Sequence, residues 1–170
     1  MGAGELARDL HLLVGLPETR AVEEIIEHAV PLGVASIVFA ACRRSGRDEL
    51  GPLKMERIER IAVASLKQSL RSRLPSLSTT SSLHTALEVA HTGPRWVAEP
   101  RGGTPPELPN EPPQLPVTLA VGPPGGFDEG EEASLRSAGF HPISLGPSRL
   151  TTETASIALL ATARNSIIYK

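Results

Sequence analysis

The stretch Val117-Thr-Leu-Ala-Val-Gly-Pro-Pro-Gly-Gly-Phe127 decides the fold. Its first five residues form a short apolar run typical of a buried strand, and a glycine-rich turn follows at once. Beyond the turn, Asp128 and Glu129 open a segment that we expect to be helical. A buried strand that leads through a tight turn into a helix is the unit of α/β folds with parallel strands. We therefore expect a mostly parallel sheet with helices on both of its faces.

Four other short runs rich in branched apolar residues predict further strands of this sheet. They span Leu10 to Leu16, Val34 to Ala40, Arg95 to Glu99 and His141 to Leu145. Apolar residues at helical spacing predict one helix that ends at Gly33 and a longer helix after Pro52. Either Ser81 or Ser82 is suited to cap a third helix that ends near His91.

Half of the sixteen prolines lie between Pro94 and Pro116. Proline lacks an N–H donor and has a fixed φ, so this segment cannot pair regularly in a sheet. We interpret residues from about 100 to 116 as a loop inside one domain that spans residues 1–170, because 170 residues suit a single core.

Composition excludes several classes of protein. The chain has no run of about eighteen apolar residues that could span a membrane, and residues 1–9 lack the pattern of a signal peptide. We therefore expect a cytoplasmic protein. The single cysteine, Cys42, cannot form an internal disulfide, and we expect it to be a small buried residue. The five histidines are scattered without ligand spacing, so we expect no metal site.

Charge is unevenly distributed along the chain. Nine of the seventeen Lys and Arg residues lie between Arg43 and Arg73, against four acidic residues, so that segment carries about +5 and the rest about -7. Such a segment suits a polyanion like RNA, whose counterions are released when basic residues bind its phosphates. A solvated helix face is the alternative. Aromatic residues make up only 3% of the chain, which argues against an RNA surface built on base stacking.

A second loop of the same kind follows the run that begins at His141. It reads Leu-Gly-Pro-Ser-Arg-Leu from Leu145 and leads into Thr-Thr-Glu-Thr-Ala, which ends at Ala155. Loops at the carboxyl ends of neighbouring parallel strands face one crevice, where such sheets bind ligands. Acidic residues directly after Phe127 would repel a phosphate, so a neutral or partly cationic ligand is favoured. The threonines before Ala155 supply hydroxyls for helix capping or for ligand contact.

These two loops resemble those of the ribosomal RNA uridine-N3 methyltransferases, a family of the knotted SPOUT class. The family pattern is Gly-Pro-Glu-Gly-Gly-Phe, an acidic helix ending in Gly-Phe, and Leu-Gly-x-Arg-Ile-Leu-Arg-Thr-Glu-Thr-Ala. The matching residues are Gly122, Pro123, Gly125, Gly126, Phe127, Gly139, Phe140, Leu145, Gly146, Leu150, Thr152, Glu153, Thr154 and Ala155. Leu32-Gly33-Val34 and Gln68-Ser69-x-Arg71, followed by Pro75, resemble further family motifs, so the resemblance runs from about Leu10 to Lys170.

The resemblance implies a C-terminal trefoil knot, a homodimer, and S-adenosylmethionine as the cofactor. It implies transfer of a methyl group to N3 of a uridine in small-subunit (16S) ribosomal RNA. The implied cofactor-binding residues are Ala98, Glu99, Pro100, Gly122, Gly125, Gly126, Leu145, Gly146, Leu150 and Thr154. The implied RNA contacts are Gln68, Arg71 and Arg149. No sequence feature identifies the base that removes the N3 proton.

The chain departs from the family pattern at charged positions. Pro124 stands where the family has Glu, and Ser148 and Thr151 stand where it has Arg. The family also carries an N-terminal RNA-binding barrel, which we expect to be absent here because the chain begins almost at its first strand. Three functions remain open at this point: an RNA methyltransferase, a catalytically degenerate relative that acts as an RNA- or ribosome-binding module, or an enzyme of another reaction on a similar α/β scaffold.

Overall fold

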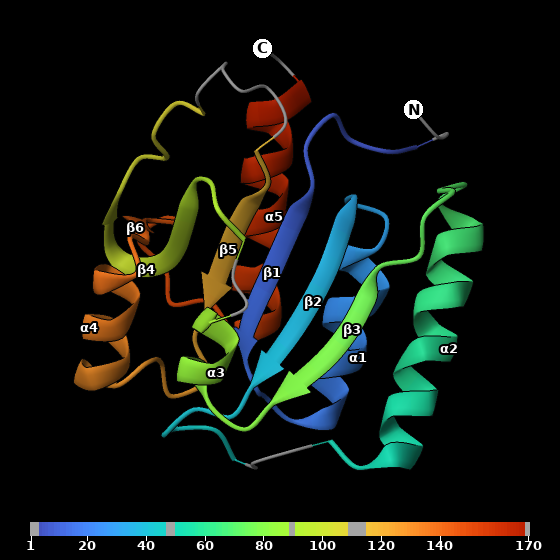
Figure 1. The fold of residues 1–170 in the computed structure, drawn as a ribbon, viewed down its shortest axis with the longest axis horizontal. Helices are drawn as coiled ribbons and strands as arrows, with labels where there is room; N and C mark the ends of the chain where they lie inside the picture. The colour runs from blue at the N-terminus through green and yellow to red at the C-terminus, as the bar shows by residue number, and fades with distance from the viewer. Residues whose placement is uncertain (1–3, 47–49, 89–90, 109–114, 169–170) are drawn as a thin grey trace.

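A computed structural model describes residues 4–46, 50–88, 91–108 and 115–168. Its six strands form one sheet in the order β3-β2-β1-β5-β4-β6, and all neighbouring strands run parallel. The strands are β1 (Leu10–Gly15), β2 (Val34–Ala40), β3 (Ser76–Thr80), β4 (Arg95–Gly103), β5 (Val117–Val121) and β6 (His141–Ile143). The expected α/β class with a mostly parallel sheet is therefore confirmed (Figure 1).

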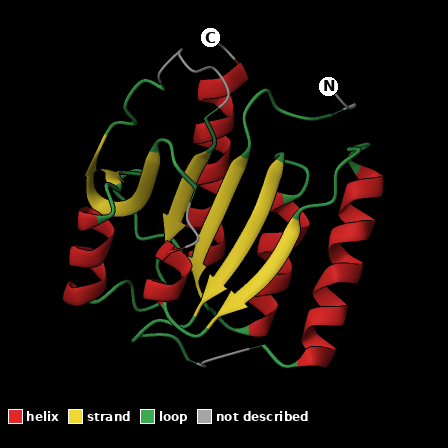
Figure 2. Cartoon of the chain, viewed as in Figure 1, coloured by secondary structure: helices red, strands yellow, loops and turns green. Residues whose placement is uncertain are grey.

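Helices cover both faces of this sheet (Figure 2). One face packs against α1 (Thr19–Ala29), α2 (Pro52–Gln68) and α5 (Thr152–Ile168), and the other against α3 (Leu83–Glu88) and α4 (Glu129–Ser137). Side chains alternate along β1: Leu12 and Val14 join the core under α1 and α5, whereas Leu13 joins the core under α3 and α4. Burial on both faces explains why β1 and β5 are continuous apolar runs.

Local sequence signals explain where several helices begin. Pro52 occupies the first turn of α2, where backbone N–H groups have no acceptor within the helix, so the N–H that proline lacks costs no hydrogen bond. Ser82 Oγ accepts a hydrogen bond from Thr85 N–H (3.1 Å), so the cap predicted for α3 is found at Ser82. The described part of α3 ends at Glu88, and the predicted end near His91 depends partly on residues 89–90, which lie outside the described segments.

Three strands differ from the sequence prediction. The polar strand β3 was not expected, because it lies at the edge of the sheet and has no buried residue to give an apolar signal. Strand β4 continues past Glu99 to Gly103, with a shift of register against β6 between Ala98 and Gly103. Strand β6 is shorter than predicted and ends at Ile143. The Pro-rich loop therefore begins after Gly103, and its residues 109–114 lie outside the described segments.

This topology positions the two loops singled out in the sequence. Since all strands are parallel, β4, β5 and β6 point their carboxyl ends to the same edge of the sheet. The glycine-rich turn follows β5, the second loop follows β6, and the bend of β4 lies between them in the sheet order. None of the helices in the described segments is both long and apolar enough to cross a membrane.

Candidate cofactor site

A cavity of about 500 Å³ lies at the carboxyl ends of β4, β5 and β6. This volume falls within the range of about 300–1,000 Å³ typical of small-molecule sites. Nine of the ten residues proposed from the sequence to bind a cofactor line it, namely Ala98, Glu99, Pro100, Gly122, Gly125, Gly126, Leu145, Gly146 and Leu150. Three segments distant in sequence therefore meet at one hollow.

The glycine-rich turn forms one wall and is folded tightly. Gly126 N–H donates to Pro123 O (2.7 Å), and Gly126 has φ +74°, which favours glycine. A Cβ atom at Gly122 would lie 3.0 Å from the backbone nitrogen of Phe127, so a side chain there would push the turn open. The sequence Gly-Pro-Pro-Gly-Gly thus gives a compact wall with backbone exposed to the cavity.

The first residue of α5 is hydrogen-bonded to this turn. Thr152 Oγ1 donates to Gly122 O (3.1 Å), and Thr152 is buried. Thr154, the tenth proposed residue, does not line the cavity; its hydroxyl accepts a hydrogen bond from Thr151 Oγ1 (3.0 Å). Thr154 N–H also donates to Thr151 Oγ1 (3.4 Å), as in a helix cap.

Two residues that position the turn were not found from the sequence. A Cβ at Gly15, the last residue of β1, would lie 2.3 Å from Pro123 Cδ, so glycine is needed for Pro123 to pack there. A glycine at the end of an apolar strand is a signal of close backbone approach that could have identified it. Arg44 donates hydrogen bonds to carbonyls of the turn, and no sequence signal links positions so far apart.

Charge in the cavity is sparse. Among the described residues, the lining contains one acidic side chain, Glu99, and one basic side chain, Arg149. The Arg149 guanidinium lies 3.5 Å from Pro124 O, so it reaches from the second loop toward the first at the solvent-exposed rim. A mostly apolar lining with backbone groups and one carboxylate suits a neutral or partly cationic ligand, as expected from the sequence.

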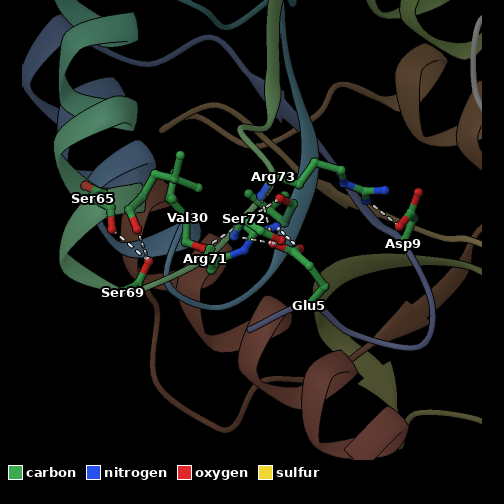
Figure 3. A network of polar contacts seen from close by, with 10 residues as sticks. Glu5, Asp9, Val30, Ser65, Ser69, Arg71, Ser72 and Arg73 are labelled. Atoms are coloured by element: carbon green, nitrogen blue, oxygen red, sulfur yellow. Dashed lines mark hydrogen bonds and ion pairs between the residues drawn. The ribbon is translucent and has the colours of Figure 1, made fainter. Parts of the chain in front are cut away.

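Arg71 lies elsewhere and corrects one prediction. Its guanidinium donates to Val30 O (2.8 Å) and Val34 O (3.0 Å) and pairs with Glu5 (2.7 Å), and its side chain is only 1% exposed (Figure 3). A side chain with these partners cannot also contact RNA in this conformation. The RNA contact that the resemblance implied for Arg71 is therefore contradicted by its burial, and Arg71 is an internal anchor.

Gln68 is exposed but is not near the cofactor cavity. It lies at the end of α2, just ahead of β3, and lines a separate hollow between α1, α2 and α5 with His28 and Ile157. Of the three proposed RNA contacts, only Arg149 lies in the cavity.

The cysteine is not a nucleophile. Cys42 is buried, as expected, and burial together with the nearby carboxylates of Glu131 and Asp128 raises the pKa of its thiol to about 12. The thiolate is the reactive form, so this thiol is inert at neutral pH. Among the described residues, no three His, Cys, Asp or Glu side chains are grouped so that they could hold a metal ion.

Two histidines stack near the amino-terminal end of β1, away from the cavity. Their environment leads us to expect that stability depends on pH. The rings of His11 and His91 lie 3.7 Å apart, and His11 Nδ1 is 2.6 Å from Ser36 Oγ. Burial, followed by repulsion from His91, lowers the pKa of His11 to about 4. An unfolded histidine binds a proton below about pH 6.5, so between pH 6.5 and 4 the unfolded chain holds more protons and folding is disfavoured.

We expect the melting temperature to fall as the pH is lowered from 7 to 5, and to fall less in His11→Asn, which cannot titrate. Differential scanning calorimetry at both pH values measures the two slopes. The other titratable groups are the same in both proteins, so the difference between the slopes reports on position 11 together with its contacts to His91 and Asp9. Equal slopes would show that His11 titrates normally in the folded protein.

A family model for the RNA methyltransferase domain matches residues 4–164. The match covers nearly the whole chain, including the sheet and every residue of the cavity lining. The fold and the site thus define the class: this is an RNA methyltransferase domain.

Individual relatives give the family within that class. The chain is 30% identical over 162 residues to ribosomal RNA small subunit methyltransferase E of Mesomycoplasma hyopneumoniae strain 232, which covers 94% of this chain and 70% of that protein. It is also 30% identical over 167 residues to the enzyme of the same name from Synechocystis sp., covering 92% of this chain and 53% of that protein. The chain belongs to the ribosomal RNA small subunit methyltransferase E family, as the loop motifs indicated. It spans between about half and 70% of the length of these relatives.

Solved structures share the fold. A methyltransferase from Legionella pneumophila in complex with S-adenosylmethionine is 28% identical, with a TM-score of 0.85 over 95% of this chain and 67% of that chain. Ribosomal RNA small subunit methyltransferase E from Neisseria gonorrhoeae, bound to S-adenosyl methionine, has the same fold, with a TM-score of 0.85 at 23% identity, covering 95% of this chain and 67% of that chain. The SpoU methyltransferase AviRb from Streptomyces viridochromogenes shares the fold at 16% identity, with a TM-score of 0.65, covering 98% of this chain and 62% of that chain.

Proposed function

We propose that this domain binds S-adenosylmethionine in the cavity at the ends of β4, β5 and β6 and methylates N3 of a uridine in small-subunit ribosomal RNA. One observation carries the proposal: the three segments that the family resemblance implied as cofactor loops line the same cavity. We further propose that the domain acts as a homodimer with a C-terminal knot, and that its ribosomal substrate places it in the cytoplasm.

The residues of the cavity fit this cofactor. Gly122, Gly125 and Gly126 offer backbone groups that side chains do not cover, which suits the hydrogen-bonding edge of adenine. Leu145 and Leu150 provide apolar surface for its faces. When bound, the cofactor supplies an electrophilic methyl group on a positively charged sulfur. Because the described part of the lining has few basic side chains, the positive sulfur would meet little repulsion there.

Arg149 is the residue that we assign to the RNA. It is the one cation that the described residues contribute to the cavity lining, and it is exposed at the rim. There it can neutralise a phosphate next to the target base. Transfer to N3 needs two things from the protein, since neutral uridine carries a proton there: the base must be held close to the methyl group, and the proton must be removed.

A second function is favoured by the positions of the lost charges. Pro124, Ser148 and Thr151, which replace charged residues of the family pattern, all line the cavity itself. We expect the loss of these charges to harm methyl transfer more than cofactor binding, because the glycines and apolar residues that shape the cavity remain. The alternative is therefore a domain that binds cofactor and ribosomal RNA without turnover.

An assay with isotopically labelled S-adenosylmethionine and unmodified small-subunit RNA separates these functions. We expect label in the RNA, recovered as 3-methyluridine after digestion and mass spectrometry. Cofactor binding without any transfer, at saturating RNA, would support the binding module and contradict the enzyme. Label on the ribose or on another base would retain a methyltransferase but contradict the uridine-N3 assignment.

A further inference from the structure

The segment after β2 is a tight turn that packs against the start of α4. Cys42 N–H donates to Ser45 Oγ (3.1 Å), and Ser45 N–H donates back to Cys42 O (2.9 Å). The intervening Arg43 N–H donates to Glu131 Oε1 (2.8 Å). Glu131 also belongs to the capping box of α4, where its Oε2 accepts from Asp128 N–H (2.9 Å). The turn is therefore fixed to the same helix start that follows the glycine-rich loop.

From this fixed turn, Arg44 reaches the glycine-rich loop. Its Nη1 donates to Gly125 O (3.0 Å) and to Phe127 O (3.1 Å). The two backbones are in close approach here, because a Cβ atom at Gly125 would lie 2.9 Å from Arg44 Cβ. Arg44 is not among the residues that line the cavity. Arg44 therefore contacts the loop from outside the cavity lining.

A hydrogen bond to a carbonyl fixes more than that oxygen. The peptide unit is planar and trans, so its C=O and the next N–H point in opposite directions. Holding Gly125 O therefore fixes the peptide whose N–H, on Gly126, donates to Pro123 O, and holding Phe127 O fixes the peptide whose N–H, on Asp128, donates to Glu131 Oε2. Both of these N–H groups are bonded within the protein, so Arg44 supports the folded shape of the turn that forms one wall of the cavity.

We propose that Arg44 is a positioning residue for the cofactor loop, and that its two hydrogen bonds preorganise the Gly125 and Gly126 peptides for S-adenosylmethionine. Glycines are the most flexible residues, so without Arg44 the loop would lose more conformational freedom when the cofactor binds. This inference rests on the proposed cofactor site. It adds a residue that lies outside that site.

The test is calorimetric titration of S-adenosylmethionine into the whole chain carrying Arg44→Ala, with Arg43→Ala as the matched control. Arg43 is the adjacent, exposed arginine, and its backbone contact to Glu131 survives the substitution. We expect the Kd to rise about fivefold to tenfold in Arg44→Ala, in line with the loss of charged hydrogen bonds in an exposed setting. We expect Arg43→Ala to stay within about twofold of the wild type.

Two further readouts distinguish positioning from a merely structural role. Millimolar guanidinium, far below denaturing concentrations, should restore cofactor affinity in Arg44→Ala, whereas sodium at equal ionic strength should not. Hydrogen exchange of the cofactor-free protein should accelerate at the amides of Gly125 and Gly126 and stay unchanged in the core strands. These measurements remain informative even where the variant is somewhat less stable.

The possible failures can be told apart. Wild-type protein that does not bind S-adenosylmethionine contradicts the proposed function. Wild-type and Arg44→Ala proteins that bind equally well contradict the positioning role alone. Exchange that accelerates throughout the chain would make Arg44 a general stabilising residue, and an effect only on the KM for RNA would make it an RNA contact; either result overturns the proposal.

Discussion

Replacing Arg71 by alanine should destabilise the protein by about 3 kcal/mol or more, the usual consequence of removing one partner of a buried ion pair. The guanidinium joins three parts of the chain: the carbonyls of Val30 and Val34 on either side of the α1–β2 connection, and Glu5 near the N-terminus. Without it, two carbonyls and a carboxylate each lose a charged donor, although Val30 O keeps the bond from Gly33 N–H and Glu5 keeps those from Ser72 and Arg73 N–H. For a domain of this size the melting temperature should fall by roughly 10 °C.

Glu5 makes the pair stronger than a simple surface contact. Burial of Glu5 opposes its charge, but hydrogen bonds from Arg71, Arg73 N–H and Ser72 N–H outweigh this and lower the pKa of its carboxyl. A depressed carboxyl pKa contributes stability above its unfolded value and loses it as the pH falls through the folded value. Arg71 is therefore paired with the charged Glu5 carboxylate, which the backbone N–H groups of Ser72 and Arg73 also fix in place.

Urea unfolding of Arg71→Ala measures the effect, and Arg73→Ala is the matched control. The Arg73 side chain is half exposed and pairs with Asp9 at the surface, so its loss should cost less than about 1 kcal/mol. Its backbone contact to Glu5 remains. A loss below about 1 kcal/mol in Arg71→Ala would contradict the anchor role, and normal stability with weakened RNA binding would restore the role inferred from the sequence.

Gly122→Val should reduce affinity for S-adenosylmethionine by more than about a hundredfold. Even a Cβ here would lie 3.0 Å from Phe127 N and 3.1 Å from the Gly126 Cα, so the branched side chain must displace the turn or fill the cavity. Either change removes a wall of the site. Loss of Arg44 only loosens the loop, whereas a valine at position 122 obstructs the cavity itself. We therefore expect a larger loss of cofactor affinity in Gly122→Val than in Arg44→Ala.

Gly130→Ala provides the control for a glycine substitution nearby. Gly130 is the second residue of α4, and a Cβ there would meet only Asp128 Oδ1, at 3.4 Å. Alanine is the better helix former, so stability should rise by about 0.5–1 kcal/mol with cofactor affinity unchanged. Calorimetric titration of both variants, with circular dichroism to check folding, measures the effect. A folded Gly122→Val protein that binds like the wild type would place the cofactor elsewhere.

The parallel sheet and the cofactor cavity were predictable because their signals are local. Apolar runs mark β1, β2 and β5, and a strand that leads into a glycine-rich turn fixes both the topology and the edge where ligands bind. The strand β3 gave no such signal, since its residues are polar and it pairs on one side only. Its place in the sheet comes from backbone pairing with β2, which leaves no trace in composition.

Residue roles were less predictable than the fold. Arg71 matched a family motif, but a motif cannot tell an RNA contact from a buried anchor, because both need the same guanidinium. The outcome depends on Glu5 and on carbonyls of Val30 and Val34, which are distant in sequence. Arg44 shows the opposite case: its partners lie more than eighty residues away, so only the folded chain reveals them.

The most direct test of the central claim is isothermal titration of S-adenosylmethionine into the wild-type chain. We expect a single site per chain with a Kd in the micromolar range, equivalent to about -8 kcal/mol, and a matching rise in melting temperature. Saturation should protect the amides of the glycine-rich turn and of the loop that starts at Leu145. Absence of both heat and thermal shift at millimolar cofactor would contradict the assignment of the cavity.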